Sequence, residues 1–433
     1  MGNTTLTRKR PRIFYGWYIV GIAMVGSFMA AGMSQVFMGV MLKPVTSDLG
    51  WSRTATSGAI TAGTLTAGLL SPFLGRLVDR HGPRLLAPAG AVFVALAFFA
   101  LAGLTALWQF YIAYIVGRSV SSVTLSGVVP MTAATNWFFR RRGPALGFIA
   151  MSLPLGGSFL AFTGQLIIDA SGWRDVFAVF GVALLVVFVI PALLIMRRRP
   201  EDIGLSPDGD DDPRGTDASN EMGSESEEEY GWALNEAVRT RSLWFLIIGL
   251  TLGITANGAI GFHQVAYYTD VGIAAKAAAL TLSVYAFAGA VANGLWGFLV
   301  ERFSERKLAV LAMLASALAI FYLLFVRNTV QALIFAVLFG LSARGESSLV
   351  MMILARYYGR RSYGTITGFV TPFQMMGLGF GPLIASISFD ITGSYKGVFF
   401  VFAASFLVAA VLMFLAKKPK APSKAGLRVS VAV

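Results

Sequence analysis

The stretch GRLVDRHGPRLLA at residues 75–87 recurs in weaker form as GFLVERFSERKLA at residues 297–309, an offset of 222 residues. A second pair, WFFRRRGPALG at 137–147 and RYYGRRSYGTITG at 356–368, is offset by about 219 residues. Each of the four stretches follows a long apolar run. Two repeats at nearly the same offset indicate that the chain consists of two similar halves in tandem.

The composition is that of a membrane protein. Of the 433 residues, 56% are hydrophobic and 13% are charged, whereas charged residues make up about 25% of an ordinary soluble domain. A helix needs about 20 apolar residues to cross the hydrocarbon core of a bilayer. Twelve such runs are present, at residues 15–42, 54–74, 84–104, 107–136, 143–168, 174–196, 242–268, 277–299, 307–326, 329–353, 364–388 and 396–416. We therefore predict an all-α membrane protein with twelve transmembrane helices in two pseudo-symmetric six-helix halves.

The formal net charge of +13 does not indicate a nucleic-acid partner. With the N-terminus in the cytoplasm, 27 of the 35 Lys and Arg residues fall in the tails and in the loops on the cytoplasmic side. This asymmetry is the positive-inside pattern that orients membrane proteins, and no basic face with interleaved aromatic residues accompanies it. We therefore expect a protein of the plasma (inner) membrane, with both termini cytoplasmic and the lipid bilayer around it.

Several kinds of chemistry are excluded by residue types. Cysteine is absent, and His81 and His263 are the only histidines, which excludes disulfides, thiolate chemistry and a histidine metal cluster. Neither a nucleotide-binding loop nor a nucleophile with a neighbouring base is found. We expect no enzyme activity, no cofactor and no metal.

An acidic segment rich in Gly, Ser and Asp separates the two sets of six runs. Such a segment cannot bury enough apolar surface to fold, so residues 197–241 are predicted to be a cytoplasmic linker. It joins an N-terminal half, residues 1–196, to a C-terminal half, residues 242–433, which ends in a short basic tail. The first apolar run is too long for a signal-peptide core and is expected to be retained.

Residues 75–84 follow the pattern G-x-L-x-D-R-x-G-x-R, which resembles the signature loop of the major facilitator superfamily. The resemblance implies a substrate site near the membrane midplane between two halves that rock. The loop charges would then hold a gate through ion pairs that break on rocking, without touching substrate. The expected gating residues are Gly75, Asp79, Arg80 and Arg84 and, in the second copy, Glu301, Arg302 and Arg306.

Longer stretches are similar to the bacterial monocarboxylate-porter and oxalate/formate-antiporter group. They include FYGWYIV at 14–20, GWRDVFAVFG at 172–181, HQVAYYTDVGI at 263–273 and GFGPLIASISFDITGSY at 379–395. The resemblance implies transport of a small carboxylate, with a proton or in exchange for another anion, by a monomeric transport unit. The basic residues that such porters carry in helices 1 and 8 are missing here, where Gly39 and Asn293 stand instead.

With the loops set aside, the ionisable residues inside the helices are Arg118, His263, Arg344 and Glu346. Charges buried in a membrane are costly and face a cavity or a partner. The resemblance places helices 4, 7 and 10, which carry the first three of these residues, around the central cavity. Both arginines lie near mid-depth, so they can grip one carboxylate by bidentate hydrogen bonds. Proton coupling or structural hydrogen bonding are the alternatives for Arg118, and a structural helix-end histidine or a proton sensor for His263.

Arg344 and Glu346 are two residues apart, about 200° around a regular helix, and cannot form a simple salt bridge on one face. Either each has a separate partner or Gly345 marks a local break. Arg344 shares its face with Ser347, and Glu346 is expected to turn to another helix, as a structural charge or as the carrier of the coupled proton. The predicted substrate-binding residues are Arg118, Arg344, Tyr114, Asn257, His263 and Ser347, with Glu346 for proton coupling; Gln35, Tyr111, Tyr267 and Tyr268 are further cavity candidates.

Taken together, these features predict a secondary active transporter of a small, monocarboxylate-like organic anion, proton-coupled or anion-exchanging, that works by alternating access. Two alternatives stay open at this point. One is an efflux transporter for drugs or other amphipathic small molecules on the same scaffold. The other is a non-transporting membrane sensor, which the acidic linker alone favours.

Overall fold

The computed structural model describes residues 14–138, 141–206, 208, 232–300, 302–358 and 363–419, and some side chains within these ranges are left out. The regular elements in the described residues are all helices. The first bundle consists of α1 (Gly16–Ala30), a short 3-10 turn (Ala31–Met33), α2 (Gln35–Leu49), α3 (Arg53–His81), α4 (Pro83–Ala102), α5 (Leu107–Thr124), α6 (Val128–Trp137), α7 (Arg142–Ser171), α8 (Trp173–Ala183), a π-helical turn (Leu184–Val189) and α9 (Ile190–Ile195). A 3-10 turn (Pro200–Ile203) and α10 (Leu234–Ala237) precede the second bundle of α11 (Arg241–Asp270), α12 (Ala275–Val300), α13 (Glu305–Leu323), α14 (Thr329–Ala343), α15 (Gly345–Tyr358), α16 (Tyr363–Thr392) and α17 (Lys396–Leu415).

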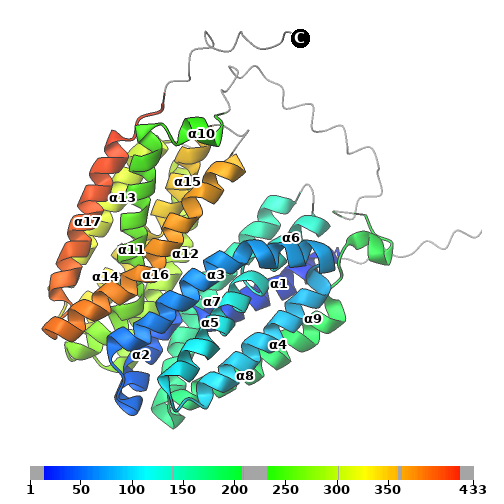
Figure 1. The fold of residues 1–433 in the computed structure, drawn as a ribbon, viewed down its shortest axis with the longest axis horizontal. Coiled ribbons are helices and arrows are strands. Elements are labelled where there is room, and N and C mark those ends of the chain that lie inside the picture. The colour runs from blue at the N-terminus through cyan, green and yellow to red at the C-terminus, as the bar shows by residue number, and fades with distance from the viewer. Residues whose placement is uncertain are drawn as a thin grey trace, which may run out of the picture.

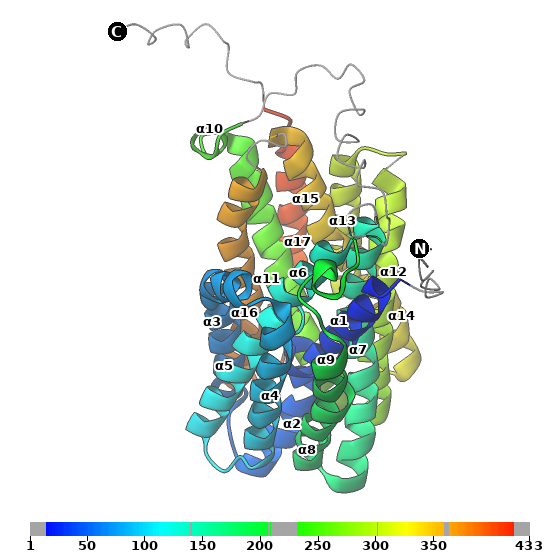
Figure 2. The same ribbon diagram turned by 90° about the vertical axis from the view of Figure 1, so that its right-hand side faces the viewer.

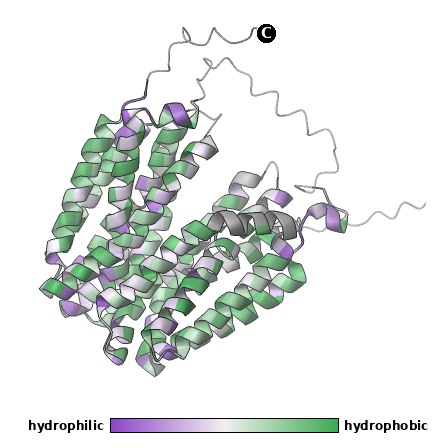
Figure 3. Cartoon of the chain, viewed as in Figure 1, coloured by the Kyte–Doolittle hydropathy of each residue, from purple (hydrophilic) through white to green (hydrophobic). Residues whose placement is uncertain are grey.

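The predicted all-α membrane architecture is confirmed. Within the described residues, ten helical spans are long and apolar enough to cross a membrane. α3 and the α14–α15 pair occupy the two remaining predicted positions, at 54–74 and 329–353. Hydrophobic residues cover the shafts of the helices and hydrophilic ones gather toward their ends (Figure 3), as a bilayer requires.

The two bundles meet at one end of the molecule and diverge toward the other (Figure 1). The diverging end carries α10 and is called the linker end; the opposite end, where α2 ends and α3 begins, is called the distal end. Three helix pairs join the bundles, namely α2 with α11, α3 with α16 and α7 with α12. The view in Figure 2, a quarter turn away, shows α3 and α16 side by side. The interface between the bundles therefore runs along long helices that belong to different halves of the sequence.

Three of the predicted spans are interrupted near mid-depth: α1 and α2 by a 3-10 turn, α5 and α6 by residues 125–127, and α14 and α15 at Arg344. A helix break inside a membrane frees backbone carbonyl groups, which need new donors. Side chains of neighbouring helices supply them. Tyr114 donates to the carbonyl of Met33 (3.3 Å) and Ser27 to that of Leu125 (2.9 Å).

The break at Arg344 is stabilised by the indole of Trp296, which donates to the carbonyl of Leu341 at 2.8 Å. In an unbroken helix that carbonyl would accept from the N–H of Gly345, four residues later. A Cβ at position 345 would overlap the indole ring, so glycine is needed for the tryptophan to approach. A side chain inserted into the helical hydrogen-bond ladder is a recognised cause of a kink. The local break that the sequence left as one alternative at Gly345 is thus present.

Candidate functional site

A cavity of about 330 Å³ lies between the two bundles. Both bundles contribute to its wall. The first contributes residues of α2, α5 and α7, and the second contributes residues of α11, α12, α16 and the break between α14 and α15. The lining residues are Ser34, Gln35, Val36, Arg118, Leu153, Pro154, Gly157, Ile254, Asn257, Gly258, Ala286, Arg344, Gln374, Met375 and Leu378. A volume of a few hundred Å³, with apolar walls and a few polar groups, is the usual form of a small-molecule site.

The cavity contains one arginine from each half of the chain. Arg118 comes from α5 of the first bundle and Arg344 from the α14–α15 break of the second. Arg118 lies 11 residues, about 16 Å, from the start of α5, which puts it near mid-depth. Its Nε is buried and has no hydrogen-bond partner among the described residues. Two guanidinium groups that line the same cavity can hold an anion between them.

Two glutamines add further unpaired polar atoms to the cavity. Gln35 donates from Nε2 to the carbonyl of Gly258 at 2.9 Å, a bond that joins the two bundles. A carbonyl only accepts, so this contact fixes the amide orientation and leaves Oε1 of Gln35 as a buried acceptor without a described partner. Nε2 of Gln374 is likewise buried without a described partner. The cavity therefore offers both donors and an acceptor next to its cationic groups.

The break at Arg344 gives its side chain a direction different from that of Glu346. The Arg344 guanidinium carbon lies 5.3 Å from the centre of the Tyr285 ring on α12. Glu346 points instead to α11, where its carboxylate occupies the space left by the missing side chain of Gly253. The two charges therefore reach different helices, as the sequence reasoning anticipated.

Glu346 is fully buried, and neither carboxylate oxygen has a hydrogen-bond partner among the described residues. The nearby Asn257 uses its amide for other contacts: its Oδ1 accepts from Tyr285 (2.6 Å), and its Nδ2 lies 3.4 Å from the carbonyl of Ala343. Burying an ionised carboxylate without hydrogen bonds is very costly. Glu346 is therefore a buried carboxyl group whose hydrogen-bonding capacity is unused by the described residues.

Of the remaining predicted binding residues whose side chains the structure describes, only Asn257 lines the cavity. Tyr114 is buried one turn from Arg118, and its hydroxyl serves the helix break at Met33. The side chain of Ser347 lies outside the described residues. His263 is fully buried on α11, away from the cavity lining. Of the further candidates, Gln35 lines the cavity, and Tyr111, Tyr267 and Tyr268 do not.

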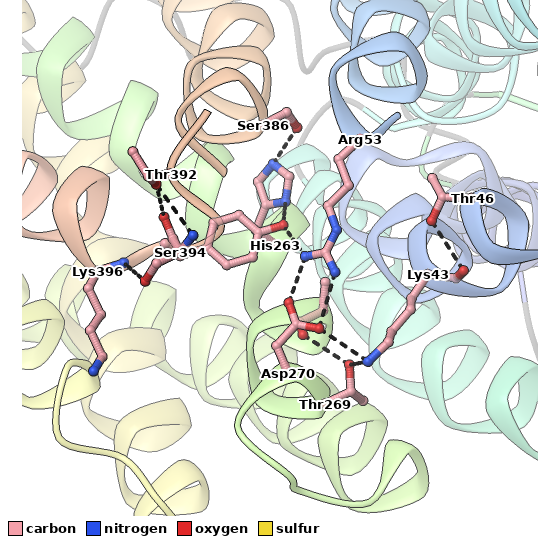
Figure 4. Close-up of polar contacts among 12 residues, drawn as sticks. Lys43, Thr46, Arg53, His263, Thr269, Asp270, Ser386, Thr392, Ser394 and Lys396 are labelled. Carbon is pink, nitrogen blue, oxygen red and sulfur yellow. Dashed lines mark hydrogen bonds and ion pairs between the residues drawn. The ribbon is translucent and has the colours of Figure 1, made fainter. Parts of the chain in front are cut away.

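A charged cluster closes the interface at the distal end (Figure 4). Arg53 lies at the start of α3 and Asp270 at the end of α11. The two terminal nitrogens of the Arg53 guanidinium, Nη1 and Nη2, donate to the Asp270 carboxylate at 2.7 and 3.1 Å. Lys43 of α2 contacts the same carboxylate at 3.1 Å. Arg53 also donates to the hydroxyl of Tyr395 at 2.6 Å. We call these residues, together with His263 and Asp390, the distal cluster.

The distal cluster continues along α3 and α16. Asp390 of α16 accepts from the backbone N–H of Thr54 at 2.9 Å, so an acidic residue of one bundle caps the first turn of a helix of the other. Thr61 donates to the carbonyl of Gly379 at 2.7 Å. Ser158 of α7 and Ser283 of α12 exchange hydrogen bonds with each other's carbonyls at 2.8 and 2.5 Å. The described hydrogen bonds between the bundles thus lie level with the cavity or distal to it.

The predicted gating charges at the linker end are only partly described. The surroundings of Gly75, the side chains of Asp79 and Arg80, and the whole of Glu301 lie outside what the structure describes. Arg84 and Arg302 are exposed and Arg306 is half-buried. A contact that the sequence reasoning missed joins Glu305, buried on α13, to Arg356 at the end of α15 (2.6 Å). Within the described residues this ion pair connects two helices of the same bundle.

The distal cluster was also missed from the sequence. Lys43 and Arg53 counted there only among the Lys and Arg residues that lie outside the tails and the cytoplasmic loops. A signal was present, because basic residues after the first apolar run face acidic residues after the seventh and eleventh, at equivalent membrane depth. Their partnership depends on contacts between residues more than 200 positions apart, which no local pattern encodes.

Two helix bundles around a cavity that contains charged side chains at mid-depth are typical of membrane transporters. The sequence model of the Major Facilitator Superfamily matches residues 23–270 and again residues 258–431. The chain belongs to this superfamily. The double match agrees with the internal repeat at residues 75–87 and 297–309.

Curated relatives include monocarboxylate transporters. The chain is 24% identical to monocarboxylate transporter 4 of Mus musculus over 424 residues, covering 94% of this chain and 84% of that protein. It is 22% identical to monocarboxylate transporter 2 of Homo sapiens, covering 93% and 85%. The multidrug resistance protein MdtG of Dickeya zeae is 26% identical over 361 residues, covering 81% and 82%.

Among solved structures, a bacterial homolog of the human lysosomal transporter Spinster, in an inward-facing and occupied conformation, has the same fold. The TM-score is 0.70 at 16% sequence identity, and the match covers 93% of this chain and 97% of that one. The match to the superfamily's sequence model and the shared fold therefore agree.

Proposed function

We propose that this protein is a secondary active transporter of a small, monocarboxylate-like organic anion. The observation that carries the proposal is the cavity of about 330 Å³ lined by Arg118 and Arg344, one from each half. A carboxylate held between them would bind both halves at once, so its binding energy depends on how the halves are arranged. That dependence is what an alternating-access transporter needs.

The direction of coupling follows from Glu346 and Arg344. A neutral Glu346 leaves the positive charge of Arg344 free for the substrate. An ionised Glu346 partly compensates that charge and weakens the hold on an anion. Proton binding at Glu346 and anion binding in the cavity then favour each other, which is the thermodynamic basis of proton-coupled symport. Anion exchange uses the same arginines without this proton.

In the proposed transport cycle the distal cluster is the outer gate, and the signature-loop residues around Asp79 and Glu301 form the inner gate. The linker end faces the cytoplasm in this assignment, in keeping with the positive-inside distribution of Lys and Arg. Rocking of the bundles breaks one gate as the other forms, around a monomeric transport unit in the inner membrane. Residues 207 and 209–231 of the predicted linker lie outside the described residues.

The second candidate is efflux of amphipathic molecules. The apolar part of the cavity wall, formed by Leu153, Ile254, Met375 and Leu378, and the similarity to MdtG favour it. The two candidates differ in what the arginines do. A carboxylate transporter needs them for affinity, whereas an efflux pump for neutral or cationic amphipaths does not.

The deciding experiment is uptake into proteoliposomes. Labelled lactate, pyruvate, formate, oxalate and longer acids are offered with and without a pH gradient, next to a cationic dye as the efflux control. We expect accumulation of at least one carboxylate, inhibited by its unlabelled congeners. Transport of the dye with no carboxylate moved, and no carboxylate that raises the melting temperature, would contradict the anion proposal. Glu346→Gln is expected to keep exchange and lose proton-driven accumulation.

A further inference from the structure

His263 holds the centre of the distal cluster although it is buried and remote from the cavity lining. Its Nε2 lies 2.9 Å from the carbonyl oxygen of Pro382 and 3.1 Å from the hydroxyl of Ser386. Its Nδ1 lies 2.9 Å from the hydroxyl of Tyr395, which in turn accepts from Arg53. Every polar atom of the imidazole therefore has a partner, and one of them leads directly to the interface between the bundles.

These contacts determine which nitrogen carries the proton. The carbonyl of Pro382 can only accept, so Nε2 must be the N–H. Nδ1 then has a lone pair and accepts from the hydroxyl of Tyr395. The phenolic oxygen keeps its own lone pairs for Arg53. The chain of donors runs from Arg53 to Tyr395 to His263 to Pro382 without a conflict, and it requires a neutral imidazole.

A proton on Nδ1 reverses one bond in this chain. Tyr395 would face two donors, the imidazolium and Arg53, and its own hydroxyl proton would lose the acceptor that the structure provides. The charge balance changes as well. Lys43 on α2 and Arg53 on α3 are matched by Asp270 on α11 and Asp390 on α16, while Tyr267 and Tyr395 complete the titratable groups around the ring. An added proton gives this partly buried cluster a surplus positive charge next to Arg53.

We infer that His263 is a proton-binding site whose protonation opens the distal gate. The strain of the protonated state is relieved when α3 moves away, because Arg53 then leaves Tyr395 and the hydroxyl becomes free to reorient. Opening also releases the cap that Asp390 provides to α3. His263 acts through Tyr395 on Arg53 and touches no substrate, so it is a positioning residue. This inference goes beyond the proposed function, since it concerns the gate and holds for any cargo.

The test uses distance measurement between spin labels across the distal end. The natural chain has no cysteine, so Ser47→Cys and Ala274→Cys introduce the only two labelling sites. Both positions are exposed and lie on different bundles beside the cluster. The labelled protein is placed in lipid nanodiscs without substrate, and the distance distribution is recorded from pH 8 to pH 5. We expect the ratio of open to closed populations to rise with falling pH, approaching tenfold per pH unit as one linked proton requires.

Two variants decide whether His263 is the group responsible. His263→Gln keeps an amide that can donate to the carbonyl of Pro382 but does not titrate, so its ratio is expected to be independent of pH. Tyr395→Phe removes the hydroxyl that links His263 to Arg53 and is expected to flatten the slope even if His263→Gln fails to fold. A flat profile in the doubly labelled protein with His263 and Tyr395 intact would overturn the inference. An unchanged slope in either variant would overturn it as well, because another group would then produce the pH response.

Discussion

The ion pair between Arg53 and Asp270 makes a quantitative prediction about the distal gate. Asp270→Asn removes a carboxylate that accepts from both guanidinium nitrogens of Arg53, at 2.7 and 3.1 Å, and from Lys43 at 3.1 Å. The Arg53 and Asp270 side chains are 12% and 24% exposed, so the pair is partly shielded from solvent. We discount the 3–5 kcal/mol that breaking a fully buried pair costs to about 2 kcal/mol.

Because the contact exists only while the bundles meet at the distal end, this free energy shifts the equilibrium between closed and open gate. A change of about 2 kcal/mol corresponds to roughly a 30-fold rise in the open-to-closed ratio. Asp48→Asn is the matched control. Asp48 binds Arg174 at 2.6 Å near the same end, but both residues belong to the first bundle and are more than 40% exposed.

The assay follows access to the cavity from the distal side. Ser34→Cys places a single thiol on the cavity wall, and a membrane-impermeant thiol reagent is added to the distal side of oriented vesicles. Asp270→Asn is expected to raise the labelling rate by roughly 30-fold, while Asp48→Asn leaves it unchanged. Labelling of Asp270→Asn at the parental rate, or equal acceleration in both variants, would contradict this prediction.

Further predictions concern the helix break and the buried carboxyl group. Gly345→Ala forces a Cβ into the indole of Trp296 and is expected to lower the free energy of unfolding by about 2 kcal/mol or more in thermal denaturation; Gly21→Ala, where a Cβ meets nothing within 4 Å, should be neutral or stabilising. Trp296→Phe leaves the carbonyl of Leu341 without its donor and should lower the free energy of unfolding by about 1–3 kcal/mol. A melting temperature equal to that of the parent would show instead that the break has closed to a regular helix. Glu346→Gln puts a neutral group of the same shape in the buried position. Its free energy of unfolding should lie within about 1 kcal/mol of the parent's near neutral pH. A much larger loss of stability would show that the ionised carboxylate is needed for folding.

The fold could be predicted from the sequence because a membrane imposes strong rules on it. Runs of apolar residues mark the helices, whereas the orientation inferred from the positions of Lys and Arg stays a prediction. The internal repeat gave the two-bundle plan, and the match to the Major Facilitator Superfamily over both halves agrees with it. Of the candidate site, Arg118 and Arg344 could be selected because few other ionisable residues remain inside the helices, and both line the cavity.

What the sequence did not predict depends on contacts between distant residues. The break at Gly345 stood as one of two alternatives, and the indole of Trp296, 45 positions away from the carbonyl that it satisfies, decides it. Tyr114 is on the expected helix, yet its hydroxyl serves the backbone of Met33. Arg53 and Asp270 each resemble an ordinary loop charge until packing brings the start of α3 next to the end of α11. Local patterns give the identity of an element, whereas the use of a polar side chain is set by its neighbours.

The central claim, that Arg118 and Arg344 together hold an organic anion, is tested most directly by binding to the purified protein. The carboxylate identified by uptake is titrated into the detergent-solubilised transporter by calorimetry, for the parent and for Arg118→Gln, Arg344→Gln and the surface control Arg174→Gln. We predict that each cavity variant raises the dissociation constant by roughly 10- to 150-fold, because a charged hydrogen bond worth about 1.5–3 kcal/mol is lost. The control variant should bind with the affinity of the parent. Unchanged affinity in both cavity variants, with the proteins folded, would contradict the account.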